Sequence, residues 1–303
     1  MTDAGATESA PVEERWLELA RGRVFTRSVG EGGVPLLCLH GGPGTPHDYL
    51  EPLEGLAAGR RVVFYDQLGC GRSDRPDDPA LWTVDYFVDE LGQVREALGL
   101  DRCHLFGNSW GGMLAMAAVL GGAAPVVSLI LSSSPASIPR WIADCNRLRA
   151  ELPDEVRATL DHHEASGFTA CPEYQGAVAA FYRRHVCRLQ PWPASFERSL
   201  AGTGLQVYET MNGPNEFTTT GRLRAFDVTD RLHEIRVPTL ITGGRHDECR
   251  PEHLAAMQRL IPRAELVIFE ASAHLAFVEE PERYLAVMED FLGRVEAEPP
   301  LPG

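Results

Sequence analysis

Short runs of apolar and β-branched residues alternate along the chain with longer stretches whose apolar residues recur at helical spacing. Such short runs are typical of buried strands, and the stretches between them favour helices. The predicted strands are Arg23–Arg27, Val34–Leu39, Val62–Tyr65, Cys103–Phe106, Val126–Leu131, Thr239–Thr242 and Leu266–Phe269. The clearest predicted helices are Asp85–Leu98, Trp110–Leu120, Pro251–Leu260 and Pro281–Arg294. This alternation predicts an α/β fold, with a mostly parallel sheet covered by helices.

The alternation stops between Ile138 and Phe226, where several amphipathic helices are predicted and no strand-like run occurs. It resumes at Asp227, and Thr239–Phe269 is needed to complete the sheet. We therefore expect an inserted helical cap over the carboxyl ends of the strands, where open α/β sheets bind their ligands. The predicted parts are a flexible tail of residues 1–15, an α/β core of residues 16–137 and 227–298, and a helical cap of residues 138–226.

The charged residues exclude several functions. All 28 basic residues of the 303-residue chain are Arg, so a P-loop lysine, a Schiff-base lysine and a Ser-Lys dyad are all excluded. The formal net charge of -15 argues against nucleic acid and anionic membranes as partners. The same charge gives mild support for a cationic small substrate, although many enzymes are acidic for solubility alone.

The seven cysteines are scattered and contain no C-x-x-C pair. Neither a disulfide framework nor a zinc site is indicated, and we expect no metal and no cofactor. Met1–Glu14 lacks the basic start and apolar stretch of a signal peptide, and no apolar run approaches the length that spans a membrane. These features predict a protein of the reducing cytoplasm.

The pentapeptide Gly107-Asn108-Ser109-Trp110-Gly111 lies between a predicted strand and a predicted helix. Glycine on both sides of the serine lets strand and helix approach closely, and the sharp turn presents the hydroxyl. This arrangement is the nucleophile elbow of serine hydrolases, so Ser109 is the predicted nucleophile.

A serine nucleophile needs a base and an acid that orients the base. In α/β folds that carry this elbow, the acid and then the histidine follow the serine in the sequence, in loops after later strands. Asp247 follows the strand Thr239–Thr242, and His274 follows the strand Leu266–Phe269, so these two are the predicted acid and base. The alternatives are Glu248 as the acid, and His246 or His253 as the base.

Acyl transfer also needs donors for the oxyanion that develops on the substrate. His40-Gly41-Gly42-Pro43-Gly44 follows an early buried strand, where this fold supplies one backbone N–H. The second donor is expected from Trp110, the residue after the nucleophile. The neighbouring segment Asp66–Ser73 is interpreted as a structural, glycine-rich turn.

Several of these segments together resemble the proline iminopeptidase family of α/β-hydrolases. The similar segments are His40–Gly44, Asp66–Ser73, Gly107–Gly112, Glu151–Pro153, Pro172–Gln175, Met211–Phe217 and Gly244–Glu248. The cap run Met-Asn-Gly-Pro-Asn-Glu-Phe and the Gly-x-x-Asp-Glu run narrow the resemblance to the tricorn-protease-interacting aminopeptidases within that family. The similarity extends from about residue 24 to residue 291.

The resemblance implies an α/β-hydrolase fold and assigns roles to individual residues. It implies Ser109, Asp247 and His274 as the catalytic triad, with Gly42 and Trp110 as the oxyanion donors. It also implies that Glu216 and Glu248 hold the free amino terminus of the substrate. Charge-assisted hydrogen bonds from an ammonium to two carboxylates would select N-terminal residues and exclude internal peptide segments. Arg245 departs from this pattern, and the sequence leaves open whether it faces the pocket.

Three functions remain after these steps. The first is a serine exopeptidase that releases N-terminal proline and other apolar residues from short peptides. The second is an amino-acid amide or ester hydrolase with the same triad, for example in secondary metabolism. The third is a hydrolase-like binding protein without catalysis, which the complete set of Ser109, Asp247 and His274 disfavours.

Overall fold

The computed structural model describes residues 10–123 and 125–298, which form an α/β-hydrolase fold around an eight-stranded sheet. The strand order is β1-β2-β4-β3-β5-β6-β7-β8; the pairs β1–β2 and β2–β4 are antiparallel, and the other pairs are parallel. The strands are β1 (Val12–Leu19), β2 (Gly22–Val29), β3 (Leu36–Leu39), β4 (Val62–Tyr65), β5 (His104–Asn108), β6 (Ser128–Ser132), β7 (Thr239–Gly244) and β8 (Ala264–Phe269). The predicted α/β class and the seven predicted strands are confirmed, with shifts of a few residues at their ends.

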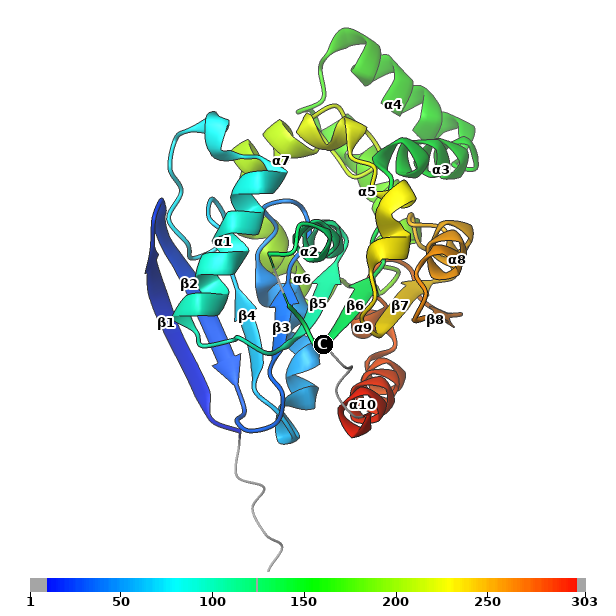
Figure 1. Cartoon of the computed structure of the whole chain (residues 1–303). Coiled ribbons are helices and arrows are strands. Elements are labelled where there is room, and N and C mark those ends of the chain that lie inside the picture. Colours follow the sequence, from blue (N-terminus) through cyan, green and yellow to red (C-terminus); the bar gives the residue numbers. More distant parts are fainter. Residues whose placement is uncertain (1–9, 124, 299–303) are drawn as a thin grey trace, which may run out of the picture.

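Alternate residues of the central strands point into two separate cores. Leu37, Leu105 and Leu131 belong to the core on one face, and Cys38, Phe106 and Ile130 belong to the core on the other. Helices cover both faces (Figure 1), so the central strands are apolar on both sides. The first face is covered by α1 (Val84–Ala97), α2 (Trp110–Leu120) and α8 (Pro251–Leu260), and the second by the 3-10 helix η1 (His47–Ala58), α9 (Ala276–Glu279) and α10 (Pro281–Ala297).

The segment from Ile138 to Phe226 contains helices and one isolated bridge, between Asn215 and Thr218, but no extended strand. Ser137 and Asp227, the residues that flank it, form a β-bridge, and the Ser137 hydroxyl donates a hydrogen bond of 2.7 Å to Asp227. The chain therefore leaves the core and returns to it at one point. Figure 1 shows α3, α4, α5 and α7 gathered beyond one end of the sheet. The helices are α3 (Ile138–Ala150), α4 (Asp154–Ser166), α5 (Pro172–His185), α6 (Ala194–Ala201), α7 (Leu205–Met211) and η3 (Arg222–Ala225).

The expected flexible tail of residues 1–15 is wrong at its C-terminal end. Strand β1 begins at Val12 and pairs residue by residue with β2, from Val12 opposite Val29 to Leu19 opposite Gly22. β1 is an edge strand, and Leu17 is its one buried residue, so the usual alternation of apolar and polar residues is absent. Residues 1–9 of the expected tail lie outside the described residues.

Candidate active site

Ser109 occupies the turn between β5 and α2 in a backbone conformation that is rare for residues other than glycine, with φ 55°. A Cβ atom at Gly107 would lie 2.3 Å from the Gly111 carbonyl oxygen, and one at Gly111 would lie 2.2 Å from the Leu39 carbonyl oxygen. Both positions therefore require glycine. Ser109 is only 8% exposed because the cap covers this end of the sheet, so its hydroxyl is less open than the sequence suggests.

His274 and Asp247 are brought together by the loops that follow β8 and β7. The Nδ1 atom of His274 lies 2.8 Å from the Oδ1 atom of Asp247, and Asp247 Oδ1 also accepts the backbone N–H of Cys249 at 2.8 Å. Glu248 is more distant, with Oε1 at 3.8 Å from the same imidazole nitrogen. Asp247 is therefore the hydrogen-bond partner of His274, which leaves Nε2 free to face a nucleophile.

The alternative bases lie elsewhere. The His246 carbonyl oxygen lies 2.9 Å from Nδ1 of His185 in the cap. His253 lies in α8, and its Nδ1 atom is 3.7 Å from the Asp144 carboxylate. His274 is the histidine that lines the pocket beside Ser109. Burial disfavours the charged imidazolium, but the Asp247 carboxylate and its hydrogen bond outweigh that effect. The pKa of His274 therefore lies above 6.5.

The candidate oxyanion donors belong to two separate elements that meet at Ser109. Gly42 lies in the loop after β3 with φ 108°, and a Cβ atom there would lie 2.6 Å from the backbone nitrogen of Thr45. Trp110 is the first residue of α2, where a backbone N–H has no acceptor within its own helix. Gly42 lines the same pocket as Ser109.

This pocket is a small cavity of about 50 Å³ between the core and the cap. The candidate catalytic and amine-binding residues in its wall are Ser109, His274 and Glu216. Among the described residues, its other lining residues are Gly41, Gly42, Thr45, Tyr49, Asn108 and Leu275 from the core, and Tyr182, Val186, Phe196 and Leu200 from the cap. The wall is therefore mostly apolar, with a carboxylate on the cap side.

Glu216 is held by three aromatic residues of the cap. The Tyr208 hydroxyl donates to the Glu216 carboxylate at 2.5 Å, and the Glu216 backbone N–H donates to the Tyr182 hydroxyl at 3.3 Å. The Trp141 indole N–H donates to the Glu216 carbonyl at 3.0 Å, and the Trp141 ring also packs edge-on against the His274 ring, 5.8 Å between centroids. Trp141 thus contacts both the candidate base and the candidate amine-binding residue.

Glu248 is fully buried, and both of its carboxylate oxygens lack a hydrogen-bond partner. Burial and then the charges of Glu216 and Asp247 raise the pKa of Glu248 well above its usual value. Burial likewise raises the pKa of Glu216. A buried carboxylate without a partner is costly, and a bound cation would supply the missing partner.

Arg245 pairs with Glu270 in the loop after β8, at 2.7 and 2.8 Å. Its side chain is 46% exposed, and it does not line the pocket. The question that the sequence left open is thereby answered, because this cation is neutralised at the surface.

Sequence reasoning did not find the residues that support the site. The Tyr49 hydroxyl accepts the Gly41 N–H at 2.7 Å and donates to the Asn108 side chain at 2.8 Å, so it ties the loop after β3 to the elbow. Trp141, Tyr182 and Tyr208 were recognisable only as cap aromatics. No local pattern identifies any of them, because each role depends on contacts that form only in the folded chain, and most of these join residues that are distant in the sequence.

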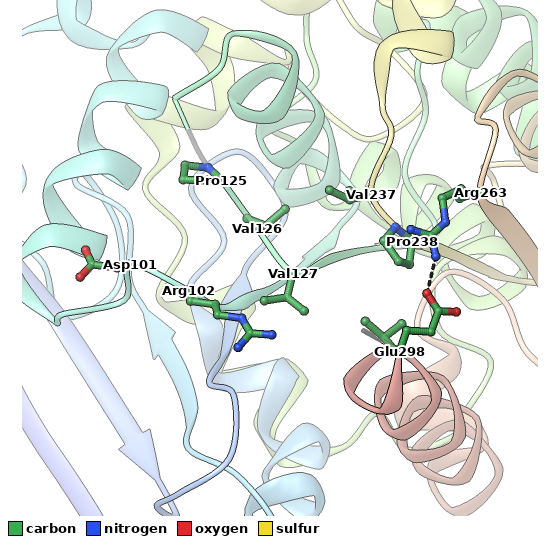
Figure 2. A pocket seen from close by; sticks show the side chains of 10 residues that line it. Asp101, Arg102, Pro125, Val126, Val127, Val237, Pro238, Arg263 and Glu298 are labelled. Atoms are coloured by element: carbon green, nitrogen blue, oxygen red, sulfur yellow. Dashed lines mark hydrogen bonds and ion pairs between the residues drawn. The ribbon is translucent and has the colours of Figure 1, made fainter. Parts of the chain in front are cut away.

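A second hollow, of about 260 Å³, lies at the opposite end of the sheet (Figure 2). The hollow is lined by Arg102, Val127 and Pro238, among others. These residues lie just before the first residues of β5, β6 and β7, respectively. Arg263 and Glu298, also in its wall, form an ion pair. This hollow is separate from the candidate active site, which lies at the carboxyl ends of the same strands.

Within residues 10–123 and 125–298, no group of His, Cys, Asp and Glu is arranged to hold a metal ion, and no helix is long and apolar enough to cross a membrane. All seven cysteines are buried free thiols.

The sheet, the elbow and the His274–Asp247 pair together define an α/β hydrolase, and the family model for the α/β hydrolase fold matches residues 34–281. The chain is 43% identical over 285 residues to a proline iminopeptidase of Heyndrickxia coagulans, covering 93% of this chain and 99% of the relative. It is 43% identical over 263 residues to a proline iminopeptidase of Saccharolobus solfataricus, covering 86% and 85%. This chain belongs to the proline iminopeptidase family of α/β hydrolases.

Solved structures agree with this assignment. The crystal structure of VinJ superposes with a TM-score of 0.91 at 41% identity, covering 93% of this chain and 99% of that chain. The proline iminopeptidase of Mycobacterium smegmatis superposes with a TM-score of 0.87 at 39% identity, covering 94% and 99%. The likeness therefore includes the cap as well as the core.

Proposed function

We propose that this chain is a serine exopeptidase that releases N-terminal proline, and other apolar residues, from short peptides through an acyl-enzyme. The observation that carries the proposal is one small pocket lined by Ser109, His274 and the Glu216 carboxylate. The curated proline iminopeptidases at 40–43% identity support the same activity. The buried free thiols support action in the reducing cytoplasm.

Ser109, His274 and Asp247 would carry the chemistry as a catalytic triad. His274 Nε2 takes the Ser109 proton while Ser109 Oγ bonds to the scissile carbonyl carbon, whose π electrons move onto its oxygen. The Gly42 and Trp110 backbone N–H groups stabilise that oxyanion. Its collapse expels the peptide amine, which takes the proton from His274, and water then hydrolyses the ester by the same route. Asp247 fixes the imidazole tautomer throughout.

Glu216 and Glu248 would bind the ammonium of the substrate. Glu248 has two unpartnered oxygens, and Glu216 presents a carboxylate to the pocket. Glu248 does not line the pocket itself, but the charge of Glu216 acts on it, so a cation bound beside Glu216 would stabilise the charged form of both carboxylates. Burial raises the pKa of both carboxylates, and a bound ammonium would favour their charged forms. N-acetylated peptides, which carry no such charge, should not be hydrolysed.

One observation favours the second candidate, an amino-acid amide or ester hydrolase with the same triad. None of the described residues that line the pocket is an arginine, and the chain has no lysine. The C-terminal carboxylate of a dipeptide would thus enter a small, acidic cavity without a cationic partner. An amide or ester leaving group meets no such penalty.

A substrate panel combined with charge-removing variants tests both the activity and the amine site. We expect Glu216→Gln and Glu248→Gln each to cost about 2–4 kcal/mol of transition-state stabilisation for prolyl-naphthylamide, as for truncation of a buried charge pair. A p-nitrophenyl acetate ester, which has no amine, should lose almost nothing. The measurement is kcat/KM for the two substrates, with prolyl amides, prolyl dipeptides and their N-acetyl forms in the wild-type panel.

Glu270→Gln is the matched control, because it removes a charge from the exposed Arg245 pair and leaves the pocket untouched. It should leave both rates unchanged. Equal losses on both substrates in Glu216→Gln would indicate general damage, and no loss on either would end the amine-binding assignment. Faster turnover of prolyl amides than of dipeptides would select the second candidate function.

The pH dependence should differ between substrates with and without an amine. For both, kcat/KM should rise with pH through the raised pKa of His274, because only the neutral imidazole accepts the Ser109 proton. For prolyl substrates, Glu248 must also lose its proton before it can bind the ammonium. Because its pKa is raised, this second proton loss contributes to the same rise. Their rate should fall again as the substrate α-amine, of pKa about 7.7–8.0, loses its proton.

The ester profile should therefore reach a plateau where the prolyl profile is bell-shaped. Both are measured as kcat/KM across pH at constant ionic strength. A prolyl profile that stays level far above the pKa of the amine would contradict recognition of the charged form.

A further inference from the structure

Gln67 lies in the segment Asp66–Ser73, which the sequence suggested was only a structural turn. Its side chain is fully buried just after β4, between the loop that follows β3 and the start of α2. The Gln67 side-chain N–H donates to the His40 carbonyl at 3.2 Å. Its side-chain oxygen accepts the Trp110 indole N–H at 2.8 Å. The Gln67 side-chain amide thus hydrogen-bonds with His40, where the loop that contains Gly42 begins, and with Trp110, the first residue of α2.

The backbone of Gln67 adds a third contact. Its N–H donates to Nε2 of His40 at 2.9 Å, which leaves the proton of the neutral imidazole on Nδ1, 3.0 Å from the Gly41 carbonyl. Burial lowers the pKa of His40 to about 4, so this neutral form persists at the pH of catalysis. The His40 ring is therefore fixed in one tautomer, with its Nδ1 proton bonded to the loop that contains Gly42.

The two oxyanion elements are packed too closely to move independently. A Cβ atom at Gly111 would lie 2.8 Å from the His40 carbonyl oxygen, the same oxygen that accepts from Gln67. A shift of the His40–Gly44 loop would therefore change the separation between the Gly42 and Trp110 N–H groups. Oxyanion stabilisation depends on donors about 2.7–3.1 Å from the developing charge, so such a shift would lower the rate.

We propose that Gln67 is a positioning residue that sets the relative placement of the two oxyanion donors, Gly42 on one side and Trp110 on the other. The inference rests on the proposed function of those two donors. Gln67 does not line the pocket, so it acts through His40 and Trp110 and not on the substrate. An amide fits this role because it donates to a carbonyl and accepts from an indole N–H at once.

The test compares two inhibitors in wild type, Gln67→Glu and Gln67→Leu. Prolinal forms a tetrahedral adduct with a catalytic serine and so requires the oxyanion donors, whereas proline, the product, does not. The readout is the ratio of the two inhibition constants, together with kcat and KM for prolyl-naphthylamide. Gln67→Glu keeps the shape but places an oxygen against the His40 carbonyl, and Gln67→Leu removes both contacts.

Each variant should lose about 10- to 100-fold in kcat and in the preference for prolinal, with KM and proline binding nearly unchanged, as expected for misplaced catalytic groups. Ser73→Ala is the matched control. The Ser73 hydroxyl donates to the Asp66 carbonyl at 2.6 Å and accepts the Phe25 N–H at 2.8 Å. It forms no hydrogen bond with His40, Trp110 or the Gln67 side chain among the described residues, so its loss should lower the melting temperature and leave the ratio unchanged.

The outcomes distinguish a failure of the proposed serine mechanism from a failure of the role proposed for Gln67. A wild-type enzyme that binds prolinal no better than proline would overturn the proposed serine mechanism itself. A wild-type preference that survives in folded Gln67 variants would overturn only the role of Gln67. If Gln67→Leu does not fold, Trp110→Phe breaks the same contact from the other side while keeping the backbone donor. Its kcat loss and that of Gln67→Glu should not add in the double variant.

Discussion

Replacing Ser109 by alanine should abolish turnover and leave the fold intact. Removal of a triad nucleophile lowers kcat by about 10⁴-fold or more, and the oxyanion donors and substrate binding alone retain only about 10³–10⁴-fold catalysis over water. The exchange removes one oxygen atom from a side chain that lines the pocket, so the free energy of unfolding should change by less than about 1 kcal/mol. The measurements are kcat for prolyl-naphthylamide and the thermal unfolding midpoint.

A fluorophosphonate probe provides the control for this variant. It should label wild-type protein at Ser109 and leave Ser109→Ala unlabelled. Activity of the variant within tenfold of wild type would mean that the nucleophile is misassigned. Failure of the probe to label the wild-type protein would instead revive the third hypothesis, a hydrolase-like protein that binds without catalysis.

The core half of the candidate site, with its proposed catalytic residues, could be predicted because its signals are local. Ser109 has glycines on both sides, which the close packing of β5, α2 and the loop after β3 requires. Asp247 and His274 each follow a recognisable strand, and parallel strands end at the same edge of a sheet. The choice of Asp247 over Glu248 was harder, since both stand in one loop. The distances of 2.8 and 3.8 Å to His274 distinguish them.

The cap half of the site was not predictable from local patterns. Glu216 looks like an ordinary polar residue of a loop, and only the family resemblance singled it out. Its contacts with Trp141, Tyr182 and Tyr208 join cap helices that are far apart in the sequence. Periodicity identifies which face of a helix is apolar, but it carries no information on which helices meet.

Two further features of the structure, strand β1 and the pKa of His274, also could not be predicted from local sequence patterns. Strand β1 escaped prediction because an edge strand has few buried residues, so its pattern is set by one neighbour, β2, and not by a core. The pKa of His274 could not be placed above 6.5 from the sequence, because the value depends on the balance between burial and the Asp247 carboxylate. Both properties arise only after the chain has folded.

Asp247→Asn should reduce kcat by about 10⁴-fold on both prolyl and ester substrates. The Asp247 carboxylate accepts the Nδ1 proton of His274 at 2.8 Å, which leaves Nε2 available as the base. An asparagine amide can donate to Nδ1 instead and so favour the tautomer with a proton on Nε2, which cannot accept from Ser109. The measurement is kcat for p-nitrophenyl acetate, a substrate that does not depend on the amine-binding glutamates.

Glu248→Gln is the matched variant, because Glu248 lies 3.8 Å from the same imidazole nitrogen and is equally buried. On the ester it should retain nearly full activity, and the reverse result, with an active Asp247→Asn and an inactive Glu248→Gln, would exchange the two roles. The residual activity of Asp247→Asn gives a second check. Since the Asp247 carboxylate raises the pKa of His274, its removal should shift the rise of kcat with pH to lower pH.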